Sequence, residues 1–332
     1  MLKNWIKRTL IASGATRLAA QVNGQGVAIL MYHSVMDDPS REANTLGGMV
    51  HSTKIFRNQM ELIARDYCPV SLDDVLHFVR EEKELPSRSV VATFDDGYAD
   101  NYEVALPVLN QVGVPATFYV TVDCIENAKL PWPSRLRYAF YTTKKKNNWN
   151  ESNGTIWPLK NFEERDRAFL KACDDCCQLA GDAQEQFVRG IERGLEAAPR
   201  ATTESPMMTW DQVRGLVQKG HIVGSHTMTH PNMAYVRDED LHTEFAESKH
   251  RLEQALNSAV VHFSYPCPAL SPHWKERTVE MSAQIGYQTA VTTDGGAVRK
   301  KQNPLCMRRV RPTKDVDGLR WNLECAFLGR RL

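Results

Sequence analysis

The chain lacks any long apolar segment and carries no excess of charge. Its longest unbroken apolar run, Val27–Tyr32, has about six residues, whereas a membrane-spanning helix needs roughly 20. The 41 lysines and arginines nearly balance the 40 aspartates and glutamates, so no global field would attract nucleic acid. The sequence therefore predicts a globular protein with no transmembrane helix and no nucleic-acid partner.

No secretory signal peptide is evident, because Gly14 and Arg17 interrupt the apolar residues of the basic N-terminal segment. We therefore expect a cytoplasmic location, in which the eight cysteines stay reduced. Only Cys173, Cys176 and Cys177 are clustered, and no second Cys or His pair stands nearby to complete a four-ligand zinc site. We interpret these three cysteines as structural residues of a helix.

Residues 1–25 are predicted to form an amphipathic helix, with apolar side chains on one face and basic ones largely off it. Such a helix usually packs on its own domain. It could instead attach peripherally to an anionic membrane surface through residues 1–20, which would place the protein at the inner membrane. Both interpretations stay open on the sequence alone.

Short strand-like segments alternate with helical ones between residues 26 and 325. Strands are expected at 26–36, 89–94, 116–122, 222–224, 260–265 and 288–292. This alternation is typical of an α/β protein with a parallel sheet or barrel, whose chemistry lies at the C-terminal ends of the strands. Residues 126–205 break the alternation. We interpret them as a partly helical insertion that either packs across the rim or forms a lid or substrate wall.

Two polar motifs follow predicted strands. In Asp95-Asp96-Gly97, the alternation of side chains along a strand directs the two carboxylates differently, so that one can bind a metal while the other acts as a base. In the H-x3-H motif, His226 and His230 can meet one cation if the backbone is helical or coiled. Each motif alone also occurs in turns or by chance. Together they form the ligand set of a catalytic divalent-metal site.

Both motifs resemble those of a known family. TFDDGY and HTMTHP are similar to the first two motifs of the polysaccharide deacetylases with NodB homology (carbohydrate esterase family 4). ILMYHSV, LPVLNQVGVPATFYV and FSYPCPA resemble the branch that acts on exopolysaccharides and lipid-linked sugars. The resemblance covers residues 26–312 apart from the insertion. It implies a distorted (β/α) barrel and a divalent metal, with Zn²⁺ favoured over Co²⁺, Ni²⁺ or Mn²⁺.

The resemblance also assigns roles to individual residues. Asp95 matches the family's general base, while Asp96, His226 and His230 match its metal ligands. Cys267 occupies the position whose backbone N–H holds the oxyanion of the tetrahedral intermediate.

The chain departs from the family pattern on the other side of the site. Ser264 stands where many members have an arginine that orients the base. Arg309 is our candidate for the missing guanidinium, and Arg308 and Arg311 compete with it for that role.

The family's usual general acid, a histidine near the C-terminus, is also missing, because no histidine follows His273. An amide needs an acid to protonate its leaving amine. We expect His33 to supply it, because this residue ends the first strand on the expected catalytic face and an imidazole suits proton transfer near neutral pH.

These features predict a metal-dependent hydrolase that removes N-acetyl groups from amino sugars of a polysaccharide, an oligosaccharide or a lipid-linked precursor. Two alternatives remain. An esterase that removes O-acetyl groups would need the same metal site, and a weakly active homologue would bind carbohydrate without turning it over. A carbohydrate is the expected partner in every case.

Overall fold

The computed structural model describes Thr9 and residues 26–145, 148–150, 154–197, 206–268 and 270–330. Apart from Thr9, the helix predicted at 1–25 lies outside these ranges, so its packing and its membrane attachment stay predictions. Within the described part of the chain, no helix is both long and apolar enough to cross a membrane.

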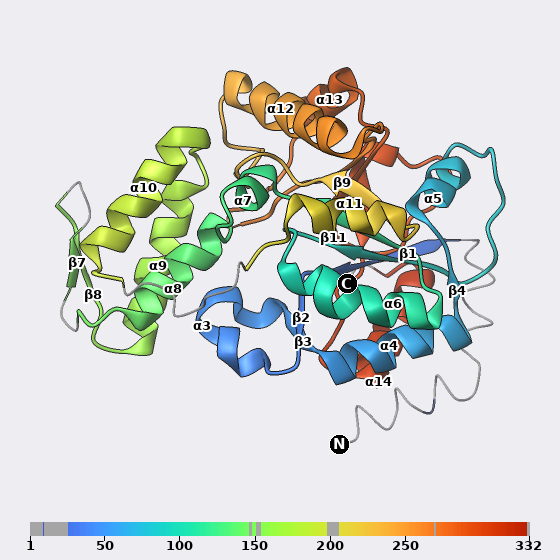
Figure 1. Cartoon of the computed structure of the whole chain (residues 1–332), viewed down its shortest axis with the longest axis horizontal. Coiled ribbons are helices and arrows are strands. Elements are labelled where there is room, and N and C mark those ends of the chain that lie inside the picture. Colours follow the sequence, from blue (N-terminus) through green and yellow to red (C-terminus); the bar gives the residue numbers. More distant parts are fainter. Residues whose placement is uncertain are drawn as a thin grey trace.

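Eight strands form one parallel sheet that curves into a nearly closed barrel (Figure 1). Their order is β1 (Val27–Tyr32), β5 (Ser89–Phe94), β6 (Ala116–Val120), β9 (Ile222–Ser225), β10 (His262–Ser264), β11 (Thr289–Gly295) and β12 (Met307–Arg309), with β4 (Cys68–Pro69) beside the start of β5. Val310 joins the two ends of the sheet: its N–H donates to the Ile29 carbonyl (2.7 Å), and the Met31 N–H donates to its carbonyl (3.1 Å). The predicted distorted (β/α) barrel is confirmed.

The strands are buried because helices cover the outside of the barrel. β1 and β5 are buried along their whole lengths, as is typical of parallel strands with continuous apolar sequences. The surrounding helices are α4 (Thr53–Asp66), α5 (Leu72–Val79), α6 (Leu106–Val112), α7 (Val122–Glu126), α11 (Trp210–Gln218), α12 (Asp238–Leu256), α13 (Glu276–Ile285) and α14 (Val316–Phe327). A small parallel pair, β2 (Ser34–Met36) with β3 (Val50–Ser52), and the short helix α3 (Ala43–Leu46) lie before α4.

Local chemistry sets where several helices begin. At the start of α5 the Ser71 hydroxyl accepts the Asp74 N–H while the Asp74 carboxylate accepts the Ser71 N–H, which forms a capping box. The helix that follows the Asp-Asp-Gly motif starts with a π-helical turn at Asn101–Ala105 and continues as α6. That turn brings the Asn101 amide to the carbonyl of His33 at the end of β1 (2.6 Å).

The segment between α7 and α11 has an apolar core of its own. It consists of α8 (Trp132–Thr142), α9 (Phe162–Cys176), α10 (Gly181–Gly194) and the hairpin β7–β8 (Asn148–Asn150 and Ile156–Pro158), which lie beside the barrel in Figure 1. The insertion is partly helical, as predicted, and the chain reverses at 177–180 between α9 and α10 so that both helices pack against α8. Cys173, Cys176 and Cys177 are free thiols buried in this core.

Gly224 in β9 is a position where the fold has no room for a side chain. A Cβ there would lie 2.6 Å from Cδ1 of Tyr119 and 2.9 Å from the His262 carbonyl oxygen. We predict that Gly224→Ala lowers the free energy of unfolding by about 1–3 kcal/mol through overpacking. Gly190→Ala is the matched control, because no atom lies within 4 Å of its Cβ position in α10 and alanine favours a helix.

Urea unfolding of both variants measures the difference. Gly224→Ala should unfold at a lower urea concentration than the parent, and Gly190→Ala at an equal or higher one. An unchanged midpoint for Gly224→Ala would show that β6 and β10 move apart without cost.

Candidate metal centre and active site

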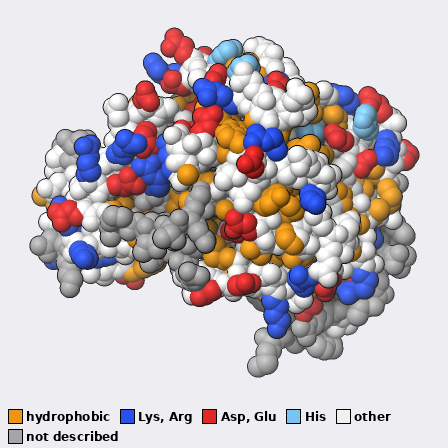
Figure 2. All heavy atoms as spheres, in the orientation of Figure 1, with side chains coloured by type: hydrophobic (Ala, Val, Ile, Leu, Met, Phe, Trp, Pro, Cys, Tyr) orange, Lys and Arg blue, Asp and Glu red, His pale blue; other side chains and the backbone are white. Residues whose placement is uncertain are grey.

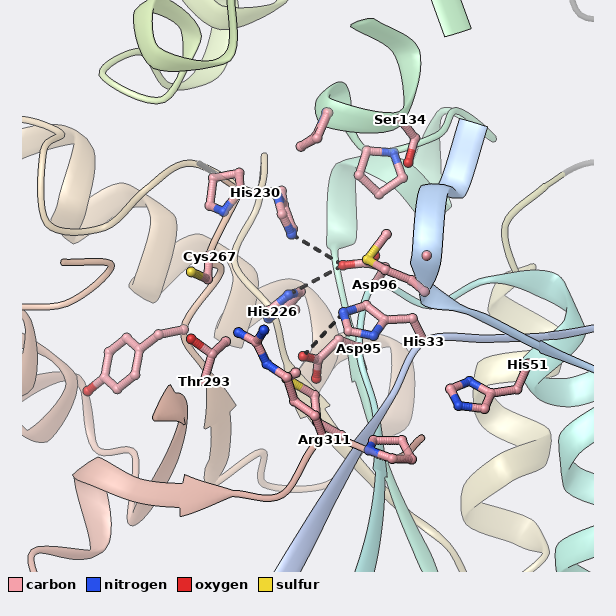
Figure 3. A pocket seen from close by; sticks show the side chains of 18 residues that line it. His33, His51, Asp95, Asp96, Ser134, His226, His230, Cys267, Thr293 and Arg311 are labelled. Atoms are coloured by element: carbon pink, nitrogen blue, oxygen red, sulfur yellow. Dashed lines mark ion pairs between the residues drawn. The ribbon is translucent and has the colours of Figure 1, made fainter. Parts of the chain in front are cut away.

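A pocket of about 410 Å³ opens where the barrel strands end, and it holds the residues that the two motifs predicted (Figure 3). Strand ends and the loops after them supply most of its wall. The insertion supplies the rest, through Pro131, Pro133 and Ser134. The insertion therefore contacts the barrel rim and also contributes to the pocket wall.

Asp96, His226 and His230 converge on one point. The Nε2 atoms of His226 and His230 lie 3.4 and 3.2 Å from the same oxygen, Oδ1 of Asp96, and the three candidate ligand atoms lie within 4.8 Å of one another. This oxygen is buried, and no described residue donates a well-aligned hydrogen bond to it. A carboxylate and two imidazoles that leave other positions open are typical ligands of a catalytic divalent cation, so the residues present fit such an ion.

The electrostatics of Asp96 agree with this geometry. Burial alone would raise its pKa, but the imidazoles of His226 and His230 outweigh burial and hold the pKa of Asp96 well below its ordinary value. The carboxylate is therefore ionised, as a metal ligand must be. His226 is also fixed in orientation, because its Nδ1 lies 2.8 Å from the Ser264 carbonyl oxygen and leaves Nε2 facing Asp96.

The sequence left open whether the backbone between His226 and His230 is helical or coiled. The structure shows an irregular loop. Thr227 and His230 have φ values of 71° and 62°, a left-handed conformation that non-glycine residues rarely adopt. Glu244 of α12 holds this loop: one carboxylate oxygen accepts the N–H groups of Met228 and Thr229 (2.8 and 2.9 Å), and the other accepts the Thr229 hydroxyl. Burial raises the pKa of Glu244 to about 7 despite these bonds.

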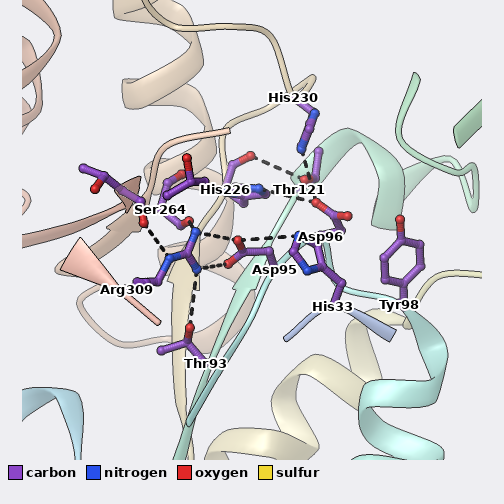
Figure 4. Close-up of polar contacts among 12 residues, drawn as sticks. His33, Thr93, Asp95, Asp96, Tyr98, Thr121, His226, His230, Ser264 and Arg309 are labelled. Carbon is purple, nitrogen blue, oxygen red and sulfur yellow. Dashed lines mark hydrogen bonds and ion pairs between the residues drawn. The ribbon is translucent and has the colours of Figure 1, made fainter. Parts of the chain in front are cut away.

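Asp95, the predicted base, pairs with Arg309 deep in the barrel (Figure 4). Nη1 and Nη2 of Arg309 donate to the two carboxylate oxygens at 2.8 and 2.7 Å. Burial would raise the pKa of Asp95, but Arg309 and His226 outweigh it, and the pKa is lowered. Arg309 also donates to the Ser264 hydroxyl (3.2 Å), so Ser264 contacts the guanidinium that pairs with Asp95.

Of the three arginines considered for this role, the structure brings only Arg309 to Asp95 among the described residues. Arg308 does not line the pocket, whereas Arg311 lines it without touching Asp95.

Cys267 is exposed on the pocket wall, where its position relative to the histidines is visible in Figure 3.

His33, the predicted acid, lies on the opposite side of Asp95 from Arg309. Its Nε2 is 4.0 Å from Oδ2 of Asp95. Burial lowers the pKa of His33, although the charges of Asp96 and Asp95 oppose this effect. The Asn101 side-chain amide donates to the backbone carbonyl of His33. Because Asn101 lies in the helical turn that follows Asp95 and Asp96, this hydrogen bond connects His33 to the segment that carries Asp95.

Several residues of the site were not predicted from the sequence. Trp132 of the insertion donates its indole N–H to the His230 carbonyl (2.8 Å), and Glu244 was hidden within an ordinary amphipathic helix. Tyr98 lies between Asp96 and Ser134, with its hydroxyl 3.4 Å from the serine oxygen. Only Tyr98 had a sequence signal, because it directly follows the Asp-Asp-Gly motif.

Comparisons with known proteins agree with the geometry. The pattern of the polysaccharide deacetylase family matches residues 82–158 and 174–290, more than half of the chain. The Bacillus subtilis (strain 168) protein YxkH, named as a polysaccharide deacetylase, is 21% identical over 290 residues, covering 87% of this chain and 72% of that protein. A poly-beta-1,6-N-acetyl-D-glucosamine N-deacetylase of Escherichia coli (strain K12) is 33% identical over 94 residues, covering 28% of this chain and 13% of that protein.

Two solved structures share the fold. Deacetylase PplD of Streptococcus pyogenes, in complex with acetate, superposes with a TM-score of 0.60 at 19% identity, covering 90% of this chain and 98% of that one. IcaB from Ammonifex degensii gives a TM-score of 0.57 at 18% identity, covering 91% and 97%. The family pattern covers more than half of the chain and the barrel agrees with it, so the chain belongs to the polysaccharide deacetylase family of hydrolases, which act on carbon–nitrogen bonds other than peptide bonds.

Proposed function

We propose that the protein removes N-acetyl groups from amino sugars of a polysaccharide, an oligosaccharide or a lipid-linked precursor. The observation that carries this proposal is the convergence of His226 and His230 on one oxygen of Asp96. The neighbouring Asp95 pairs with Arg309 instead of these imidazoles. The E. coli relative named above acts, by its name, on a polymer of N-acetyl-D-glucosamine. An acetylated amino sugar is therefore the substrate class that we propose here.

Asp96, His226 and His230 would hold a divalent cation, with Zn²⁺ the first choice for a site of one carboxylate and two imidazoles. When bound, such an ion supplies a Lewis acid that polarises the acetamide carbonyl and increases the acidity of water. Asp95 accepts the proton of the attacking water. Its lowered pKa keeps it ionised at neutral pH, and the bidentate Arg309 fixes its orientation.

The remaining steps concern the acetamide itself. In this mechanism the backbone N–H of Cys267, on the pocket wall, donates to the oxygen that becomes negative when water adds to the carbonyl. His33 then donates a proton to the sugar nitrogen, so that the amine leaves as the carbon–nitrogen bond breaks and acetate is formed. We place this reaction in the cytoplasm or at the inner membrane, which favours a soluble or lipid-linked substrate.

An O-acetyl esterase is the second candidate, because it would use the same ligands and the same base. The proton donor distinguishes the two reactions. An alcohol leaves an ester more readily than an amine leaves an amide, so an esterase depends less on His33.

The first prediction from this proposal concerns the metal and the base. Acetate release from acetylated oligosaccharides and lipid-linked sugars should be lost on complete removal of metal and return on addition of Zn²⁺. Asp95→Asn should lower kcat by about 10²–10⁴ because the base is lost, while Zn²⁺ binding persists because Asp95 is not a ligand. Calorimetry of Zn²⁺ binding and an acetate assay measure the two effects. Full activity in the metal-free protein would contradict the metal site.

The second prediction concerns His33 and pH. Because burial lowers the pKa of His33 from its ordinary value of 6.5, its protonated form is lost as the pH rises through a value below 6.5. The acid-dependent step should slow in the same range. His33→Gln should lower kcat for acetamides by about 10²–10⁴ and remove this part of the pH profile.

His51→Gln provides the control for His33. His51 is another histidine of the same pocket. It is buried, and burial lowers its pKa to about 4, so it stays neutral over the pH range of the assay. If His51→Gln removed the same part of the pH profile, or if His33→Gln kept it, His33 would not be the acid.

The third prediction concerns Glu244. Without its carboxylate, the loop that carries both histidines loses three hydrogen bonds, so Glu244→Ala should weaken Zn²⁺ binding by about 10- to 100-fold, as is usual for groups that orient metal ligands. Glu244→Gln should retain most of the affinity, because its amide oxygen can accept the two backbone N–H groups while its NH₂ donates to Thr229.

Glu324→Ala is a matched control for general destabilisation. Glu324 is equally buried but binds Arg88 and Tyr67, away from the pocket. Calorimetric titration of the metal-free proteins with Zn²⁺ should show unchanged affinity for this control even if its thermal stability falls. Equal losses of affinity in the two alanine variants would refute a specific role for Glu244.

A further inference from the structure

Arg311 is a basic side chain of the pocket whose guanidinium has no partner among the residues that the structure describes. It lies two residues beyond β12, is exposed, and lines the same pocket as the predicted metal ligands. Within the described ranges its guanidinium forms no ion pair and no hydrogen bond, and only its backbone carbonyl is engaged, by Asn322. Its charge is therefore available to a molecule that enters the pocket.

The guanidinium is directed into the pocket and not along its outer rim. Figure 3 shows the side chain extending across the opening toward the side on which Thr293 and Cys267 lie. Thr293 lines the same pocket, and its backbone N–H donates to Nε2 of the buried His273 (3.1 Å). A sugar bound with its acetamide at Asp95 and Asp96 would therefore have Arg311 within reach of a neighbouring substituent.

The charges of the pocket favour an anion at this position. Of the two carboxylates that line the pocket, Asp95 is already paired with Arg309, and Asp96 faces the two imidazoles with which it would hold a divalent cation. A divalent cation at Asp96 would leave the pocket with surplus positive charge even before Arg311 is counted. A neutral sugar compensates none of this charge, whereas a guanidinium binds a carboxylate or a phosphate through two parallel hydrogen bonds.

We propose that Arg311 binds an anionic group, a carboxylate or a phosphate, that the substrate carries beside its acetamido sugar. This inference rests on the proposed deacetylation and narrows its substrate class to acidic acetamido saccharides. The role differs from stabilising the oxyanion, because the anionic substituent is charged before the reaction begins. Arg311 therefore contributes to binding of the ground state, which affects KM more than kcat.

The test compares three substrates: a neutral oligomer of N-acetylglucosamine, an oligosaccharide of N-acetylmuramic acid, which carries a carboxylate, and an N-acetylglucosamine phosphate. The parent should prefer one or both anionic substrates. Arg311→Met should raise KM for the preferred anion so that the ratio of kcat/KM between anionic and neutral substrates falls about 10- to 100-fold, as expected on losing hydrogen bonds to a charged group. Arg311→Lys, which keeps the charge without the paired donors, should retain part of the preference.

Arg308→Met is the matched control, because Arg308 belongs to the same strand end but does not line the pocket. It should leave the substrate preference unchanged. The preferred anionic substrate also distinguishes a carboxylate from a phosphate as the bound group.

Four outcomes would overturn the inference. An equal fall in kcat for neutral and anionic substrates in Arg311→Met would assign Arg311 to the oxyanion or to folding, and a parent that prefers the neutral oligomer would exclude anion recognition. Acetate release with no change of preference in Arg311→Met would refute this inference alone. If the parent released no acetate from any substrate, the proposed function would fail and this inference with it.

Discussion

The buried pair of Arg309 and Asp95 is the interaction on which the organisation of the site depends. Taking two charges out of water is costly unless their geometry is close to ideal and their remaining donors are satisfied. Here the bidentate contact, the Thr292 carbonyl and the Ser264 hydroxyl satisfy the guanidinium. The pair joins β5 to β12 on either side of β1, near the Val310 hydrogen bonds that close the barrel. Closure of the barrel and ionisation of Asp95 therefore support each other.

The sequence predicted the parts of the structure that depend on local patterns. The alternation of buried strands and helices predicts the barrel, because each element must bury its own apolar face. Asp95, Asp96, His226 and His230 were found because each pair lies within a few residues of a strand end. Neighbouring side chains of a strand point to opposite faces. This alternation explains why Arg309 faces Asp95 and Arg308 does not.

The remaining parts depend on contacts between distant segments, which no local pattern reveals. Glu244 lies on a helix whose sequence gives no sign that its carboxylate faces the histidine loop. The π-helical turn at Asn101 and the reversal at 177–180 also follow from packing and not from propensity. The loop between the histidines was considered as helical or coiled because spacing alone does not specify φ, and its left-handed residues are tolerated where Glu244 and the first turn of α7 hold the backbone.

The hydrogen bond from Trp132 to the His230 carbonyl has a consequence for how such barrels diversify. Insertions at strand ends are usually regarded as exchangeable parts that alter substrate choice while the chemistry stays constant. In this chain the first turn of the insertion touches the backbone of a predicted metal ligand and also forms part of the pocket wall. The pocket wall and the loop that carries His230 are therefore mechanically connected, and a chimera that exchanged the insertion would change the surroundings of both.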